Sequence, residues 1–414
     1  MKWQKRTPEE IKSKIFEALS KNVNYSSEII LGVPASYLDE KVFPQNKTFL
    51  KDAAFLSALV QNPNHIGCHT LGESESFFHG TQEIERELIE ICGVDILKGE
   101  KDELDGYVAS GGTEANIQAI WIYRNYFQSV YSAKTSEIAI ICSQDSHYSM
   151  DKAANLLGIQ LIKVATDEQT KTLQKNELCR ILDDSEAQGI RYYIVVANML
   201  TTVFGSVDNP TIYTDELTKR KANFKLHIDG AYGGFYYPFS NKHTNLNFSN
   251  PFVSSVTLDA HKMAQAPYGT GIFLIRKGFI HFATTKQASY VEGEDCTLSG
   301  SRSGANALAV WMILATYGQN GWFEKIFILQ KRTDYLCEKL EELELEFFRD
   351  PNSNIVAIRS SSMAHEIAVK YHLVPDNHHE ANWYKIVVME HVTLDKIEPF
   401  LADLKHHFSK PMIL

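Results

Sequence analysis

The sequence predicts an α/β protein in which a mostly parallel sheet, covered by helices on both faces, precedes a smaller α+β domain. The first observation is that continuous β-branched runs alternate with helical segments between about residues 105 and 260, as in parallel sheets. The second is a change of pattern after about residue 306, where helices and two isolated strands follow. The 414 residues, 44% hydrophobic and 22% charged, suffice for two or three domains with a buried core.

The N-terminal arm, residues 1–55, is predicted to begin with an amphipathic helix at 7–20. Thr7 is a suitable N-cap for that helix, and a proline occupies its first position. A second helix is predicted at 81–93, because apolar residues recur on one of its faces. Gly93 is the expected C-cap of this second helix.

The large domain is assigned to residues 56–303 and the small domain to residues 304–414. In the large domain, strands are predicted at 105–110, 137–143, 191–198, 224–229 and 254–260, and helices at 113–124, 151–158 and 215–224. In the small domain, helices are predicted at 307–318, 334–343 and 393–408, and strands at 354–359 and 384–390.

Charge and composition exclude several classes of partner. The 51 acidic and 41 basic residues give a net charge of −10, which disfavours binding to nucleic acid or to an anionic membrane surface. The chain contains no apolar stretch of the ~18 residues that a membrane span needs, and its charged first residues do not resemble a signal peptide. The six cysteines are scattered without a CxxC pair, as in reduced proteins. We therefore expect a cytoplasmic protein.

A glycine-rich turn precedes the helix predicted at 113–124. In SGGTEAN (residues 110–116), Gly111 and Gly112 let the backbone approach a ligand, and Thr113 adds a hydroxyl. The N-terminus of the helix adds oriented N–H groups and a positive dipole, which together suit one phosphate group. The segment is neither a Walker loop nor a GxGxxG fingerprint, and Gly-Gly before a helix can also be only a tight turn.

Two charged residues follow apolar strands. Asp229, in HIDGAYGG, ends one strand, at the edge where open α/β sheets bind ligands. Lys262, in DAHKMAQAPYG, follows the next strand, 33 residues further along the chain. An amine held in a poorly solvated place becomes nucleophilic. Taken singly, Asp229 could instead be a helix N-cap and Lys262 a surface lysine.

The combination of a phosphate site, a strand-end aspartate and a later lysine is what pyridoxal phosphate requires. The phosphate would lie at the helix N-terminus, Asp229 would pair with the pyridine nitrogen, and Lys262 would form the Schiff base. His147, in SQDSHYSM, is placed to stack on the pyridine ring, although taken alone it could be a polar loop histidine.

The motifs SGGTEAN, DSHYS, HIDGAYGG, DAHK and SGSRSG, in this order, resemble those of the group II pyridoxal-phosphate amino-acid decarboxylases. The resemblance runs from about residue 60 to the C-terminus. It is closest to the archaeal-type L-tyrosine/L-aspartate decarboxylases, through NPNHIGCHT, FHGTQEIERELI and KIVVMEHVTLDKIEPFLADL. It implies the aspartate-aminotransferase-like (type I) fold, with a seven-stranded sheet in the large domain and a small C-terminal domain.

The resemblance also implies roles for individual residues. Lys262, Asp229 and His147 are expected to be catalytic, and Tyr290 is a candidate proton donor by its position. Gly300 and Ser301 are expected to reach the phosphate of the other subunit, so that a homodimer is the functional unit. The other implied cofactor-binding residues are Gly111, Gly112, Thr113, Thr201, Thr202, Ala231 and His261.

The sequence departs from the family pattern in three places. Only the segment KQASYVEGEDC, residues 286–296, precedes SGSRSG, so the long loop that carries a catalytic tyrosine in animal aromatic decarboxylases is expected to be absent. Leu200 precedes the Thr201–Thr202 pair where relatives often have glycine, so this loop is expected to sit differently. Lys385 stands at the start of a late strand where relatives often carry arginine, and lysine cannot offer a carboxylate a bidentate fork. The cluster His65, Cys68 and His69 is interpreted as a loop on the substrate side, and no metal site is expected.

The expected reaction is α-decarboxylation of an L-amino acid, with tyrosine, aspartate and glutamate as the first candidates. Two alternatives remain open at this point. One is an aldehyde lyase of the sphingosine-phosphate lyase type, which shares most of the motifs. The other is a catalytically silent protein that binds the cofactor and acts as a regulator.

Overall fold

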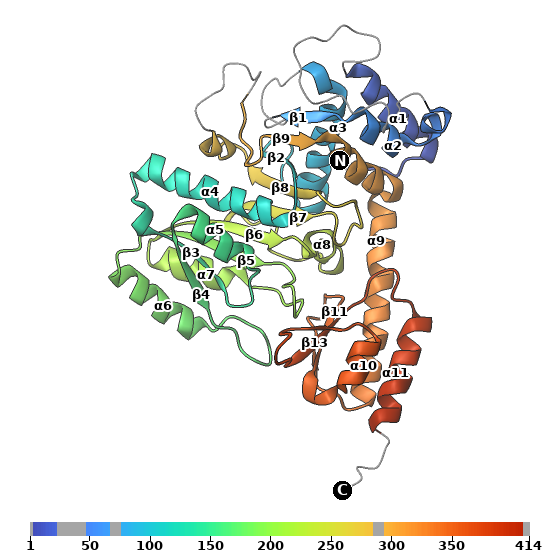
Figure 1. Ribbon diagram of the computed structural model, residues 1–414. Coiled ribbons are helices and arrows are strands. Elements are labelled where there is room, and N and C mark those ends of the chain that lie inside the picture. Colours follow the sequence, from blue (N-terminus) through green and yellow to red (C-terminus); the bar gives the residue numbers. More distant parts are fainter. Residues whose placement is uncertain (1–2, 23–46, 67–75, 285–293, 409–414) are drawn as a thin grey trace.

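The computed structural model describes residues 3–22, 47–66, 76–284 and 294–408. Its centre is a seven-stranded sheet with the strand order β2-β8-β7-β6-β5-β3-β4 (Figure 1). Only β8 runs antiparallel to its neighbours, which confirms a mostly parallel sheet. The strands are β2 (Leu104–Ala109), β3 (Ile138–Ser143), β4 (Gln160–Val164), β5 (Tyr192–Asn198), β6 (Asn223–Gly230), β7 (Val253–Asp259) and β8 (Gly271–Arg276).

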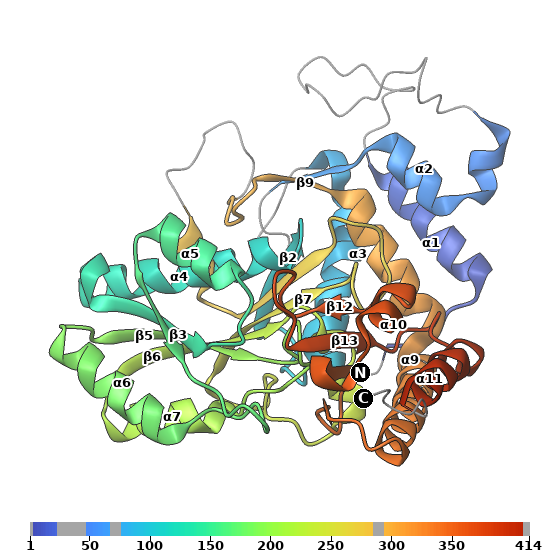
Figure 2. The ribbon, with the colours of Figure 1, turned by 60° about the horizontal axis from the view of Figure 1, so that its bottom comes forward.

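Helices cover both faces of this sheet because its central strands are apolar on both sides. On β3, Ile138 and Ile140 pack into one hydrophobic cluster, whereas Ala139 and Ile141 pack into another. Helices α4 (Gly112–Tyr131) and α5 (Ser149–Leu157) cover the first face, and α6 (Lys175–Ala187) and α7 (Pro210–Lys219) lie on the opposite one (Figure 2).

Further helices, most of them from the N-terminal part of the chain, complete the second face. They are α1 (Pro8–Lys21), α2 (Ala54–Gln61), α3 (His79–Glu90), the short α8 (Tyr237–Ser240) and the N-terminal half of α9 (Gly304–Glu342). The N-cap of α1 is as predicted, because the Thr7 hydroxyl accepts from the Glu10 N–H at 3.2 Å and the Glu10 carboxylate accepts from the Thr7 N–H at 2.7 Å. Strands β1 (Asn64–Ile66) and β9 (Ser301–Ser303) form a separate antiparallel pair near these helices.

The C-terminal part of the chain forms an antiparallel four-stranded sheet with the order β10-β11-β13-β12. Helix α9, 39 residues long, runs from the large core to this sheet and changes direction at Gly318 (Figure 1). Leu329 still belongs to the large core and Leu336 to the small one, so the boundary after residue 303 stays a prediction. The other elements are β10 (Phe347–Phe348), β11 (Ile355–Arg359), α10 (His365–Lys370), β12 (Val374–Pro375), β13 (Trp383–Val387) and α11 (Leu394–Phe408).

Some sequence predictions need correction. Gly93 does not cap α3, because a π-helical turn, Ile91–Ile96, continues the helix past it. A Cβ atom on Gly93 would lie 2.6 Å from the Leu104 side chain, so the glycine serves the close approach of β2. The helices predicted at 307–318 and 334–343 are both parts of α9. Strands β4 and β8 and helix α6 were not predicted.

In the part of the chain that the structure describes, none of the helices combines the length and apolar character that crossing a lipid bilayer demands.

Candidate active site

A cavity lies where the parallel strands β5 and β6 end, as expected for a ligand site in an open α/β sheet. Six of the residues predicted for the site line it together: His147, Thr201, Thr202, Asp229, Ala231 and Lys262. Three further residues also line the cavity and were not predicted to do so: Asn198, Leu200 and Tyr232. Asn198 is the polar residue at the end of the apolar strand β5, and this position in the sequence could have indicated a site residue.

Asp229 lies near the carboxyl end of β6 and is only 7% exposed. Its Oδ1 accepts a hydrogen bond from the Ala231 N–H at 3.1 Å, and its Oδ2 accepts one from Asn116 Nδ2 at 2.9 Å. A buried carboxylate needs such partners. They fix its orientation toward the cavity that it lines.

Lys262 follows β7 in a tight turn that also contains Asp259 and His261. Lys262 Nζ lies 4.0 Å from Asp259 Oδ2. His261 Nδ1 lies 2.8 Å from Asp259 Oδ1, although the geometry is not that of a hydrogen bond. Burial raises the pKa of Asp259, whereas the Gly112 N–H and the nearby cations lower it. Asp259 was not predicted as a site residue, although it ends the apolar strand β7 much as Asp229 ends β6.

The glycines of the predicted phosphate site pack closely against this turn. A Cβ atom on Gly112 would lie 3.0 Å from the Ala231 Cβ, and one on Gly111 would lie 3.6 Å from His261 Cε1. The Gly112 N–H donates to Asp259 Oδ2 at 2.9 Å, so this donor already has an anionic partner. Thr113 occupies the first turn of α4, where the helix dipole favours a further anion.

His147 lies in the loop between β3 and α5, at one side of the cavity. Its Nδ1 accepts a hydrogen bond from the Ser149 N–H at 3.2 Å and lies 2.9 Å from Ser149 Oγ. Burial lowers the pKa of His147, Asp229 raises it, and the Lys262 ammonium lowers it.

The loop after β5 brings Thr201 and Thr202 to the cavity. Leu200 is buried and has a φ of 66°, a left-handed conformation that glycine adopts without strain. The loop therefore keeps a backbone shape suited to glycine although leucine occupies the position. Thr201 Oγ1 accepts from the Ser206 N–H at 3.1 Å, and the Thr202 carbonyl accepts from Lys385 Nζ at 2.9 Å.

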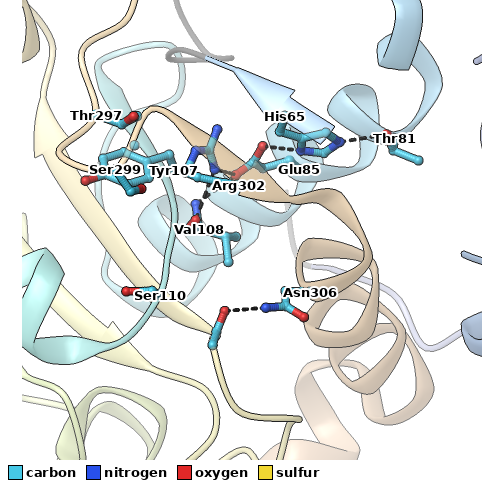
Figure 3. Close-up of polar contacts among 12 residues, drawn as sticks. His65, Thr81, Glu85, Tyr107, Val108, Ser110, Thr297, Ser299, Arg302 and Asn306 are labelled. Carbon is cyan, nitrogen blue, oxygen red and sulfur yellow. Dashed lines mark hydrogen bonds and ion pairs between the residues drawn. The ribbon is translucent and has the colours of Figure 1, made fainter. Parts of the chain in front are cut away.

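The segment that carries Gly300 and Ser301 is held by a buried ion pair (Figure 3). Arg302, in the middle of β9, donates to Glu85 Oε1 at 2.5 Å and to the Val108 carbonyl at 3.0 Å. The other oxygen of Glu85 lies 2.8 Å from His65 Nδ1. Gly300 and Ser301 themselves are not among the described residues that line the cavity.

This arrangement corrects the interpretation of His65. The residue lies in β1, not in a loop on the substrate side, and it is fully buried. Its Nε2 lies 2.6 Å from Thr81 Oγ1, so both ring nitrogens have protein partners (Figure 3). Burial lowers the pKa of His65, and Glu85 raises it.

Three predicted residues, Tyr290, Cys68 and His69, lie outside the described residues. Within the described ranges, no group of three or more His, Cys, Asp or Glu side chains is arranged to hold a metal ion.

Comparison with known proteins identifies the family. The profile described as "Pyridoxal-dependent decarboxylase conserved domain" matches residues 84–359. The Tryptophan decarboxylase of Clostridium sporogenes is 50% identical over 97% of this chain and 97% of its own. The chain belongs to the pyridoxal-dependent decarboxylase family. The Probable L-tyrosine/L-aspartate decarboxylase of Methanocella arvoryzae is 31% identical to this decarboxylase over 84% of the chain and 92% of its own.

The fold of the decarboxylase agrees with this assignment. The crystal structure of L-methionine decarboxylase from Streptomyces sp. 590 superimposes with a TM-score of 0.68 at 21% identity, covering 83% of this chain and 86% of the other. The large sheet and the small C-terminal sheet therefore form the type I fold that the resemblance implied.

The residues present fit pyridoxal phosphate, the cofactor of the family. The cavity combines a lysine amine, a buried carboxylate and an imidazole ring, which are Lys262, Asp229 and His147. A side chain at Gly112 would fill the space between α4 and Ala231, so the glycine keeps the helix N-terminus close to the site. This decarboxylase is thus a pyridoxal-phosphate-dependent enzyme that decarboxylates an amino acid.

Proposed function

We propose that the enzyme decarboxylates an aromatic L-amino acid, with tryptophan as the first candidate and tyrosine as the second. The observation that carries the reaction is the convergence of Lys262, Asp229 and His147 on one cavity at the carboxyl ends of the strands. The substrate class rests on the 50% identity to a protein named tryptophan decarboxylase, over nearly the whole of both chains. The sequence alone had favoured tyrosine, aspartate or glutamate, and tyrosine fits both lines of reasoning.

The lysine and the carboxylate of the cavity, and the helix N-terminus near them, then have separate tasks. Bound pyridoxal phosphate would supply the electron sink into which the electrons of the broken C–C bond move. Lys262 would hold the cofactor through its amine, and Thr113 with the N-terminus of α4 would bind the phosphate. Asp229 would keep a proton on the pyridine nitrogen, because its carboxylate is buried and already oriented by Ala231 and Asn116.

After CO₂ leaves, the α-carbon must receive a proton. Lys262 and His147 both line the cavity and can carry one. Tyr290 is the third candidate, by its position in the sequence. We also infer a homodimer as the functional unit, in which Gly300 and Ser301 serve the phosphate site of the other subunit.

The proposal is tested by measuring CO₂ and amine from each of the twenty amino acids, diaminobutyrate and ornithine. We expect the highest kcat/KM for tryptophan, with tyrosine next. The Lys262→Ala variant should release no CO₂ from any of them and should lack the visible absorbance of lysine-bound pyridoxal phosphate. Lys277→Ala, which removes a lysine bonded to the Asp102 carbonyl, is the matched control and should keep both.

Three results would contradict the proposal. A preference for aspartate or glutamate would exclude the aromatic substrate class. Retention of the absorbance band in Lys262→Ala would exclude the assigned lysine. Formation of an aldehyde instead of CO₂ and amine would indicate the lyase alternative.

A further inference from the structure

A buried hydrogen-bond network lies behind the cavity and is centred on Asn116, in the second turn of α4. The side chain is 1% exposed. Its Nδ2 donates to Asp229 Oδ2 at 2.9 Å and to Ser149 Oγ at 3.0 Å. Its Oδ1 lies 3.0 Å from His227 Nε2. One amide therefore contacts three groups that come from distant parts of the chain.

The carboxylate of Asp229 fixes which way this amide points. An ionised carboxylate only accepts hydrogen bonds, so Nδ2 must face Asp229 and Oδ1 must face His227. His227 Nε2 then carries a proton. Burial lowers the pKa of His227 to about 4, so the ring is neutral at pH 7 and its Nδ1 accepts from Ser255 Oγ at 2.7 Å. Tyr123 closes this branch by donating to Ser255 Oγ at 2.5 Å.

The other branch leads to His147. Because Ser149 Oγ accepts a hydrogen from Asn116, its own hydrogen can point to His147 Nδ1, 2.9 Å away. The backbone N–H of Ser149 donates to the same nitrogen at 3.2 Å. An N–H can only donate, so Nδ1 carries no proton and the neutral ring holds its proton on Nε2.

We propose that Asn116 is a positioning residue that links Asp229 to His147. Its amide orients the carboxylate and, through Ser149, holds His147 in the tautomer with a proton on Nε2. That tautomer can donate a hydrogen bond or a proton to a bound molecule through Nε2, whereas the other tautomer could only accept there. The inference rests on the roles proposed above for Asp229 and His147.

The isosteric variant Asn116→Asp separates the hydrogen-bond role from packing. The titratable groups that face position 116 are Asp229 and His227 on β6, and His147 beyond Ser149. A second carboxylate beside Asp229 has a raised pKa, because two like charges resist ionising together. When the new carboxyl group at position 116 is protonated, its O–H can still donate a hydrogen bond to Asp229. When it is ionised, it repels the Asp229 carboxylate. We therefore expect the ratio of kcat in Asn116→Asp to kcat in the wild type to fall as pH rises.

Asn116→Leu removes the amide at every pH. Its kcat/KM should drop by roughly 10- to 100-fold, the effect of losing a hydrogen bond to a charged group, with a ratio to the wild type that does not vary with pH. Ser185→Ala, which removes a buried hydroxyl bonded to Tyr193, is the control for a general loss of stability and should retain wild-type kinetics. Wild-type kinetics in Asn116→Asp at every pH would overturn the proposal.

A measurement without cofactor or substrate tests the tautomer directly. The apoenzyme is labelled with ring-¹⁵N histidine, and the His147→Gln variant identifies the His147 signals. We expect Nδ1 to be unprotonated and Nε2 protonated in the wild type, and these signals to shift in Asn116→Asp and in Ser149→Ala but not in Ser185→Ala. A proton on Nδ1 of wild-type His147 would refute the inference even if the substrate assignment holds. If Asn116→Asp does not fold, the spectra of the wild type and of Ser149→Ala still show which nitrogen of His147 is protonated and whether Ser149 determines it.

Discussion

Lys385, on β13 of the C-terminal sheet, contacts the loop that lines the cavity, although it is not among the described lining residues. Its Nζ donates to the Thr202 carbonyl at 2.9 Å, on the loop that lines the site. Burial lowers the pKa of Lys385, and the Lys262 ammonium lowers it further. An anion that binds beside two cations relieves their mutual repulsion. We predict that the carboxylate of the amino-acid substrate is this anion.

Replacing Lys385 with methionine should therefore weaken substrate binding. We expect KM for the preferred amino acid to rise by roughly 10-fold or more, with a smaller change in kcat, because a charge-assisted hydrogen bond is lost. Lys385→Arg keeps the charge and should lie closer to the wild type. Steady-state kinetics on the three proteins makes the comparison. An unchanged KM in Lys385→Met would mean that another group binds the carboxylate.

Among single residues, the sequence predicts those whose immediate neighbours in the chain already indicate a site. Asp229 ends one apolar strand and Lys262 follows another, and only together with the glycine-rich turn does this pattern indicate a ligand site at the sheet edge. Asn116 has no such signal, although it lies inside a motif that was singled out. Its role is defined by Ser149, His227 and Asp229, which meet it only after folding.

Among the elements, helix α9 depends on an interruption in its middle. Gly318 has a φ of 61° there, and the N-terminal segment crosses the helix at this point. The Trp3 indole donates to the Leu314 carbonyl at 3.1 Å, and the Arg6 N–H donates to the Ala315 carbonyl at 2.8 Å. The arm thus satisfies carbonyl groups that a change of direction leaves without helical partners.

Gly318→Ala should destabilise the fold by about 2 kcal/mol or more, because the left-handed φ and a clash both oppose a side chain. A Cβ atom there would lie 2.5 Å from the Lys5 backbone nitrogen. Gly321→Ala is the matched control in the same helix, since its Cβ would meet only Tyr317, at 3.7 Å. It should be neutral or stabilise by about 0.5–1 kcal/mol. Urea denaturation followed by circular dichroism gives both values, and equal midpoints would disprove this account.

Strands β4 and β8 were not predicted, and the physical reason differs between the two. Strand β4 is an edge strand with exposed residues at Gln160 and Lys163, so it lacks a continuous apolar run. Strand β8 has such a run, GIFLIR, but no helix separates it from β7. A connection without a crossover helix joins antiparallel neighbours, which is how β8 pairs with β7. The alternation of strands and helices therefore does not indicate β8.

Across the whole molecule, hydrogen bonds connect the proposed phosphate site with the Gly300–Ser301 segment. Arg302 bonds Glu85 and the Val108 carbonyl on β2, the strand that leads into Gly111 and Gly112. Ser299 donates to Glu114 in the first turn of α4 at 3.1 Å. The segment thus lies beside the proposed phosphate site of its own chain, with Ser301 exposed. The homodimer proposed above assigns Ser301 to the phosphate site of the second subunit, and the alternative is the site of its own chain.

Mixing the subunits of two inactive variants distinguishes these two arrangements. Ser301→Glu puts a negative charge where a phosphate would bind, and Lys262→Ala removes the cofactor lysine, so each variant should be inactive alone. If Ser301 acts across the dimer, a mixed dimer has one intact site, made of Lys262 from one chain and Ser301 from the other. Random exchange should then restore about a quarter of the wild-type sites, since half of the dimers are mixed and each has one good site.

The pair Lys262→Ala and Asp229→Ala is the control, because both lesions lie in the same cavity and no mixed dimer contains an intact site. Native mass spectrometry of differently tagged chains verifies that exchange has taken place. Recovery with the first pair and none with the second would require a site built from two subunits. No recovery despite complete exchange would place Ser301 at the site of its own chain, where the Ser299–Glu114 contact would hold it.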